Sequence, residues 1–148
     1  MVRKKRGSPL AKSKQGQETR EVNRQTRSDN FISFSFRYFQ DTDMPPAQSL
    51  ENWDQNNMLY DMLNSLKHMS QNNITELQLR DKKLTLYQSF PQASVNDFSL
   101  PANLSDAENW GCLRNIGGQK ARIAGFLRDN VFYVVYLDKD HKFYKSKR

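Results

Sequence analysis

The sequence contains one cysteine, Cys112, and no long apolar run. A single cysteine excludes an intramolecular disulfide and every zinc site that needs two or more thiolates. No window approaches the roughly 18 apolar residues of a membrane span, and no apolar stretch follows the basic N-terminus as a secretory signal requires. These absences predict a cytoplasmic protein that makes no membrane contact.

Aromatic residues are missing from the first thirty positions, which also hold few apolar residues. Residues 1–30 carry nine Lys/Arg against three acidic residues, a net charge of +6. Such a segment buries too little surface to offset the entropy lost on ordering. We therefore expect a flexible basic tail over residues 1–30 and a single folded domain over residues 31–148, which holds all 17 aromatic residues.

Charge is unevenly distributed over the rest of the chain as well. Residues 31–110 hold five basic and ten acidic residues, or −5, and residues 111–148 hold nine basic and three acidic residues, or +6. With the +6 of the tail, the three parts sum to the net charge of +7. Basic ends around an acidic middle favour a polyanion partner. The alternative is that the basic residues serve solubility alone.

The first half of the domain predicts one strand and two helices. Residues 31–39 alternate between apolar and polar side chains, which is typical of a half-buried strand. Pro45 and Pro46 then interrupt the ladder. Ser49 suits the N-cap of a helix of about twenty residues ending near Met69, because apolar residues recur there at helical spacing. A second, shorter helix is expected from Ile74 to about Lys82.

The second half predicts an antiparallel sheet. Residues 84–109 are irregular, with one short strand near residues 84–87, and a further strand is expected at residues 112–116, before a turn at Gly117-Gly118.

Asp129-Asn130 separates two apolar strands, Arg122–Leu127 and Val131–Leu137, and so predicts a hairpin. Both faces of the second strand are apolar, so we expect it to be covered on both sides. An N-terminal strand, two helices and then an antiparallel sheet ending in a hairpin make an α+β fold.

Basic and titratable side chains gather around this hairpin. Cleavage of RNA without a metal needs a base for the 2′-hydroxyl, cations for the phosphorane and an acid for the leaving oxygen. His141 suits either proton-transfer role, Arg114 and Arg122 offer bidentate phosphate geometry, and Tyr136 or Tyr144 would orient the phosphate or stack on a base. We predict Arg122, His141 and Tyr144 as catalytic residues, and as RNA-binding residues Arg114, Lys120, Arg128, Lys142 and Lys145.

Two other interpretations of these residues remain open. In the first, His141 follows a strand end without a catalytic role, and the basic residues only keep the sheet edge solvated. In the second, Asp138, Asp140 and His141 hold a divalent metal, although no partner cluster elsewhere in the sequence supports it. We predict no metal and no cofactor.

The stretch LRNIGGQKARIAGFLRDNVFYVVYLDKDHKFY, residues 113–144, resembles the RelE/HigB-type superfamily of toxins. There an arginine-bearing strand leads through a hairpin into a hydrophobic central strand and a terminal His-x-x-Tyr. The matching positions are Arg122, Val131–Leu137, His141 and Tyr144. The resemblance implies an mRNA endoribonuclease (mRNA interferase) that acts on the ribosome by metal-free acid–base catalysis and is neutralised by an antitoxin protein. The tail and the long segment over residues 84–109 are not part of that pattern.

Two further functions are compatible with the residues. One is a non-catalytic nucleic-acid-binding module, in which the tail and the sheet hold RNA or DNA through salt-sensitive contacts. The other is a phage or plasmid accessory protein, in which the acidic middle and the methionine-rich helix bind a partner protein.

Overall fold

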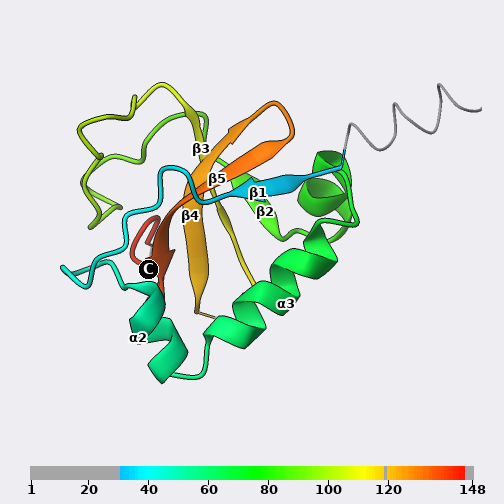
Figure 1. Ribbon diagram of the computed structural model, residues 1–148. Helices are drawn as coiled ribbons and strands as arrows, with labels where there is room; N and C mark the ends of the chain where they lie inside the picture. Colours follow the sequence, from blue (N-terminus) through cyan, green and yellow to red (C-terminus); the bar gives the residue numbers. More distant parts are fainter. Residues whose placement is uncertain (1–30, 119, 146–148) are drawn as a thin grey trace, which may run out of the picture. The chain divides into compact units, whose positions relative to one another are not determined.

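The computed structural model describes residues 31–118 and 120–145, so the tail predicted over residues 1–30 lies outside the described residues. The chain divides into a unit of residues 1–31 and a unit of residues 32–148, and all the helices and strands described here belong to the second. That unit is an α+β fold built on a five-stranded sheet (Figure 1), which confirms the predicted class. None of the helices in the described ranges is long and apolar enough to cross a membrane.

The sheet has the strand order β1-β5-β4-β3-β2. Four strands are antiparallel neighbours: β2 (Leu84–Leu86), β3 (Asn109–Leu113), β4 (Arg122–Arg128) and β5 (Val131–Asp138). The edge strand β1 (Ser33–Ser35) runs parallel to β5. The sheet is therefore mixed. A parallel pair requires a long crossover, which the helices and strands β2, β3 and β4 provide between β1 and β5.

The strand predicted over residues 31–39 is only three residues long. Ile32 is buried in the core, as the alternation predicts. A turn then reverses the chain, since the N–H of Phe39 donates to the carbonyl of Phe36 at 3.1 Å. The prediction was wrong from this turn onwards, because Tyr38, within the turn, lies against Phe126 on the opposite face of the sheet from Ile32.

The long helix predicted from Ser49 to Met69 is two helices, α2 (Leu50–Gln55) and α3 (Leu59–Met69). Ser49 caps α2 as predicted, and its hydroxyl oxygen accepts the N–H of Asn52 at 3.0 Å. The two helices are separate because Asn57 adopts a left-handed conformation with φ 59°. The prediction of one helix was wrong because the apolar spacing continues across this break.

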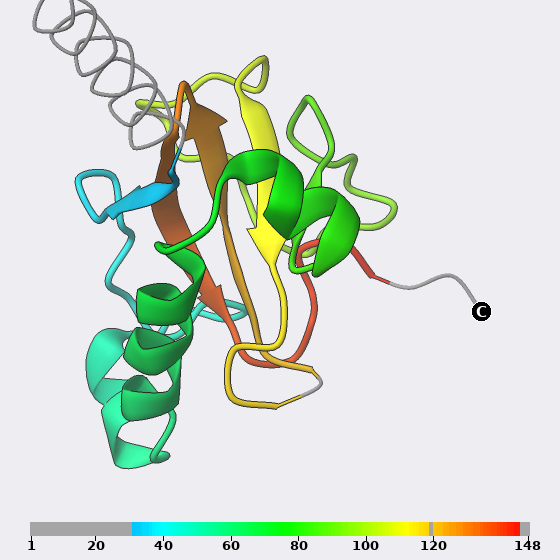
Figure 2. The same cartoon turned by 90° about the vertical axis from the view of Figure 1, so that its right-hand side faces the viewer.

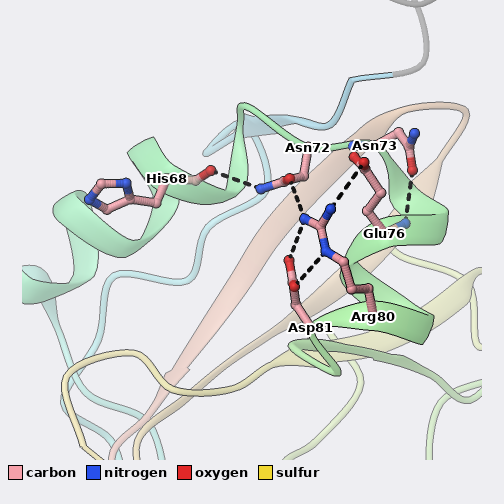
Figure 3. A network of polar contacts seen from close by, with 6 residues as sticks. All are labelled: His68, Asn72, Asn73, Glu76, Arg80 and Asp81. Carbon is pink, nitrogen blue, oxygen red and sulfur yellow. Dashed lines mark hydrogen bonds and ion pairs between the residues drawn. The ribbon is translucent and has the colours of Figure 1, made fainter.

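The second predicted helix is the short π-helix η1 (Glu76–Arg80). At its start, the Oδ1 of Asn73 accepts the N–H of Glu76 at 2.8 Å, and the Oε1 of Glu76 accepts the N–H of Asn73 at 2.9 Å. The guanidinium of Arg80 then bonds to Asn72, Glu76 and Asp81 (Figure 3). This network connects η1 to the turn that follows α3.

Strand β3 was predicted over residues 112–116 and lies over residues 109–113. The chain leaves the sheet after Leu113 because Asn115 and Gly117 take left-handed conformations, with φ 61° and 87°. The sequence pattern missed this early end because Ile116 is apolar and fully buried outside the strand.

Two hydrophobic clusters cover the two faces of the sheet. The helices pack on one face, where the cluster includes Trp53, Met62, Met69, Leu77, Leu113, Ile123, Phe132 and Leu137. The other face is covered by the segment between β2 and β3 and by the segment after β5, with Phe90, Phe98, Trp110, Phe126 and Phe143. Figure 2 shows α2 and α3 at the lower left, and the bright green loops after β2 with the red C-terminal segment at the right. Strand β5 contributes to both clusters, which confirms that it is covered on both sides.

The predicted hairpin is formed by β4 and β5, with Asp129 at φ 56° in its turn. A bulge next to Gly125 shifts the register, so that Gly125 pairs with Val134 while Ala124 pairs with Tyr136. A Cβ atom at Gly125 would overlap the carbonyl oxygen of Tyr133, which explains the glycine. The bulge changes which residues face each cluster, and it places Tyr136 on the face away from the helices.

Candidate active site

A cavity of about 550 Å³ opens on the sheet face that the helices do not cover. Thr85 of β2 and Cys112 of β3, which are register partners, contribute to its lining. Strand β4 contributes Arg122, and the segment after β5 contributes His141 and Tyr144. The remaining lining residues are Tyr87, Arg114 and Lys145. The three residues predicted as catalytic therefore line one cavity, together with two of the five predicted RNA-binding residues.

Arg122 begins β4 and is only 7% exposed, at the position paired with Asp138 of β5. Its Nη1 donates to the carbonyl of Ala121 at 3.3 Å. Burial raises the pKa of the fully buried Asp138, and N–H donors from the following turn oppose that rise. A guanidinium held at the cavity wall presents planar N–H donors that match two oxygens of a phosphate.

The turn after β5 is held by Asp138. Its carboxylate accepts the backbone N–H groups of Lys142, at 2.8 and 2.9 Å, and of Phe143, at 2.9 Å. Within this turn His141 adopts φ 59°, an unusual conformation for a residue other than glycine. Phe143 is buried in the aromatic cluster and thereby anchors Tyr144 beside the cavity. The turn thus fixes both residues of the His-x-x-Tyr pair.

His141 is partly buried, and three basic side chains lie near its imidazole. Burial, followed by the positive charges of Arg122, Arg114 and Lys120, lowers the pKa of His141 below its ordinary range. The imidazole is therefore neutral at pH 7, and one ring nitrogen is able to accept a proton. No acidic side chain is among the described residues that line the cavity. A bound phosphate would bring negative charge and raise the pKa of His141 again.

Tyr87 and Tyr144 form one wall of the cavity, with stacked rings whose centroids are 4.5 Å apart. The hydroxyl of Tyr87 lies 3.0 Å from the Sγ of Cys112. Burial raises the pKa of Tyr87 and of Cys112, so both groups keep their protons at neutral pH. Cys112 is therefore no thiolate nucleophile. Tyr144 is 38% exposed and offers a ring to a ligand.

No protein-family model matches the chain, and no curated protein or solved structure gives a significant match. The function is therefore inferred from the cavity itself.

The cavity is surrounded by three of the predicted RNA-binding residues, Arg114, Lys120 and Lys145. Arg114 and Lys145 line it, and Lys120 is close enough for its charge to lower the pKa of His141. The Nζ of Lys145 also bonds to Asp97 at 2.8 Å, and this hydrogen bond lowers the pKa of that carboxyl. These three cations make the cavity a suitable place for an anion.

Lys142 and Arg128, also predicted to bind RNA, are not among the cavity's lining residues. Lys142 lines a separate hollow, and its Nζ is 4.0 Å from Asp97. Arg128 is at the opposite end of β4 from Arg122, where it pairs with Glu108. Proximity along the sequence suggested a single basic cluster, but the length of β4 separates its two arginines.

The described lining of the cavity does not include Tyr136, Asp138 or Asp140, and Asp140 lines the same separate hollow as Lys142. The hydroxyl of Tyr136 donates to the carbonyl of Ser99 at 2.6 Å, outside the cavity. Asp138 bonds to backbone N–H groups. Within residues 31–118 and 120–145, no three His, Cys, Asp or Glu side chains are grouped to hold a metal.

Sequence reasoning missed Tyr87 and Cys112 as residues of this site. Both come from strands or strand ends whose hydrophobic pattern predicts packing only. They reach the site because Thr85 pairs with Cys112, which brings Tyr87 alongside the thiol. The one available signal was the aromatic residue, Tyr87, at the end of the short strand expected near residues 84–87.

Proposed function

We propose that the protein is an RNA endonuclease of the toxin type that cuts by metal-free acid–base catalysis in this cavity. The supporting observation is that Arg114, Arg122 and Lys145 share one cavity with a neutral His141 and the Tyr144 ring. RNA has the matching parts, namely a 2′-hydroxyl to deprotonate, a charged phosphodiester and a base to stack.

The reaction uses groups of this chain alone. His141 takes the proton of the 2′-hydroxyl while O2′ attacks the adjacent phosphorus. Arg114 and Arg122 stabilise the charge that develops on the non-bridging oxygens. The bond from phosphorus to O5′ then breaks, and O5′ takes a proton, for which the cavity offers the Lys145 ammonium and the Tyr144 phenol. The products are a 2′,3′-cyclic phosphate and a 5′-hydroxyl.

The natural substrate in this proposal is mRNA on the ribosome, in the cytoplasm, and the partner is an antitoxin protein. The support is the resemblance of residues 113–144 to the RelE/HigB-type toxins and the net charge of +6 over residues 111–148. Cations along such a surface attract RNA before any base is recognised.

The deciding experiment is cleavage of a labelled mRNA, with and without translating ribosomes and with and without EDTA. We expect ribosome-dependent cuts that survive EDTA and leave a 2′,3′-cyclic phosphate. His141→Ala should slow cleavage by about 10²-fold or more, because the general base is lost. The matched control is His68→Ala, since His68 is the other histidine of the chain and lies exposed on α3.

Three outcomes count against this function. Equal losses in the two histidine variants would remove His141 from the chemistry. Cleavage of a strand with 2′-deoxyribose at the cut site would contradict attack by O2′. Salt-sensitive retention of RNA without any cut would identify a non-catalytic binding module instead.

A further inference from the structure

A second hollow, of about 510 Å³, shares Tyr87 and Tyr144 with the first cavity. Its other walls come from the irregular segment that follows β2, with Ser89, Phe90, Pro91, Gln92, Ser94 and Val95. The stacked tyrosine pair therefore stands between two compartments, which we call the phosphate cavity and the amide pocket.

The two compartments differ in charge. Arginine, lysine and histidine side chains line the phosphate cavity, whereas the described residues that line the amide pocket carry hydroxyl, amide and apolar groups and include no charged side chain. A nucleotide has the same division, with its charge on the phosphate and an uncharged, flat, hydrogen-bonding base. Each compartment thus suits one part of an RNA strand, and the amide pocket is large enough for a base.

The wall of the amide pocket is bonded into the fold. The N–H of Phe90 donates to the carbonyl of Asp106 at 2.9 Å, and the N–H of Lys145 donates to the carbonyl of Val95 at 2.7 Å. Asn96, only 4% exposed, donates from its amide to the carbonyl of Pro91 and accepts the N–H of Phe98. Because Lys145 also lines the phosphate cavity, its hydrogen bond to Val95 fixes the position of one compartment relative to the other.

We propose that the amide pocket binds an unpaired RNA base next to the cleaved phosphate. Gln92 and Ser94 hydrogen-bond the edge of that base, and Tyr144 stacks on its face. The substrate is consequently single-stranded, since bases within a duplex do not present these edges. The inference rests on the proposed endonuclease function and adds to it a preference for one base beside the cut.

Binding of trinucleotides with 2′-O-methyl sugars tests the pocket apart from cleavage, because these strands have no attacking hydroxyl. Each of the four bases, and an abasic sugar, is placed next to one phosphate. We expect the trinucleotide with one particular base at that position to bind about tenfold more tightly than the abasic trinucleotide. Gln92→Ala and Ser94→Ala should reduce that ratio, while Gln71→Ala, an exposed glutamine beyond the end of α3, should leave it unchanged.

Cleavage of unmodified RNA by the same variants completes the test. Wild-type affinity that is equal for base and abasic strands, or absent for all of them, overturns the amide pocket even if the protein cuts RNA. A base preference that survives in Gln92→Ala and Ser94→Ala overturns it as well. A base preference lost in Gln92→Ala, with no cleavage of unmodified mRNA by the wild type even on translating ribosomes, keeps the pocket as a base site and overturns the endonuclease.

Discussion

Asp138 accepts the backbone N–H of Lys142 with both of its carboxylate oxygens, at 2.8 and 2.9 Å. Because Asp138 is paired with Arg122 across the hairpin, this contact closes the turn of His141 next to the arginine. The position of the proposed general base therefore depends on an aspartate that takes no part in the chemistry.

Replacing Asp138 should separate this positioning role from charge alone. Asp138→Ala leaves the buried N–H of Phe143 and the partly buried N–H of Lys142 unpaired, and we expect it to lower the free energy of unfolding by about 2 kcal/mol. RNA cleavage by the folded fraction should also fall, because the turn no longer fixes His141. Urea unfolding and cleavage rates measure the two effects. Asp140→Ala, at an exposed position two residues later, is the control, and equal losses in both variants would contradict this role.

The pKa of His141 gives a second prediction. Titration followed by NMR should place it below the ordinary value of 6.5, and inorganic phosphate should raise it. His68→Ala assigns the two histidine signals. Cleavage should increase as pH rises through the lowered pKa, because the base must be neutral. The unfolded chain binds the proton more strongly, so protonation of His141 destabilises the fold as pH falls from 6.5 towards that lower pKa. A pKa above 6.5 without phosphate would contradict the burial argument.

Arg114 and Arg80 allow a comparison of two variants with the same charge change. Arg114 lines the phosphate cavity, whereas the guanidinium of Arg80, at the end of η1, is held by Asn72, Glu76 and Asp81 (Figure 3). Arg114→Ala should weaken RNA binding and reduce the slope of log K against log salt by about 0.7 to 1. Arg80→Ala should change neither quantity. Fluorescence anisotropy at several salt concentrations measures both, and equal effects would show that net charge alone matters.

Cys112 should be chemically inert in the native state. It is 6% exposed, and burial raises the pKa of its thiol, so iodoacetamide should modify the folded protein far more slowly than the unfolded chain. Cys112→Ala should retain most of the cleavage rate. A loss as large as that of His141→Ala would instead make the thiol part of the reaction.

Gly125 should tolerate no side chain. Gly125→Ala places a methyl group against the carbonyl of Tyr133, and we expect a loss of about 3 kcal/mol in the free energy of unfolding. Gly118→Ala meets no neighbouring atom within 4 Å and strains only the backbone, at φ 144°, so it should cost about 1 kcal/mol. If urea unfolding gave similar losses of unfolding free energy for Gly125→Ala and Gly118→Ala, the overlap at Gly125 would be relieved by a shift of β5.

Sequence reasoning succeeded where the signal is local. Ser49 caps a helix, and Asp129 makes a turn between two apolar strands, because each of these roles depends on the residue and its nearest neighbours. A two-residue turn also fixes the register of a hairpin. The turn alone would place Arg122 opposite Leu137, and the bulge next to Gly125 moves its partner by one residue to Asp138. In either register, His141 follows the partner of Arg122 within four residues and cannot be far from it.

The rest of the site depends on contacts between segments far apart in the sequence. Nothing in the hydrophobic pattern of residues 84–86 shows that Thr85 pairs with Cys112, so the place of Tyr87 was not predictable. The break at Asn57 was hidden because asparagine also occurs inside helices. Gln92 and Ser94 have the composition of an ordinary loop, and only the fold gives them a shared pocket.

The parallel pairing of β1 with β5 also sets when during synthesis the fold can be completed. Ser33–Ser35 leave the ribosome early, but their partner Val131–Asp138 is made almost a hundred residues later. The cavity is likewise incomplete until His141 and Tyr144, which follow β5, have been synthesised. A nascent chain therefore cannot complete either the β1–β5 pairing or the cavity until residues 131–144 have been synthesised, so the fold and the proposed site form together, late in synthesis.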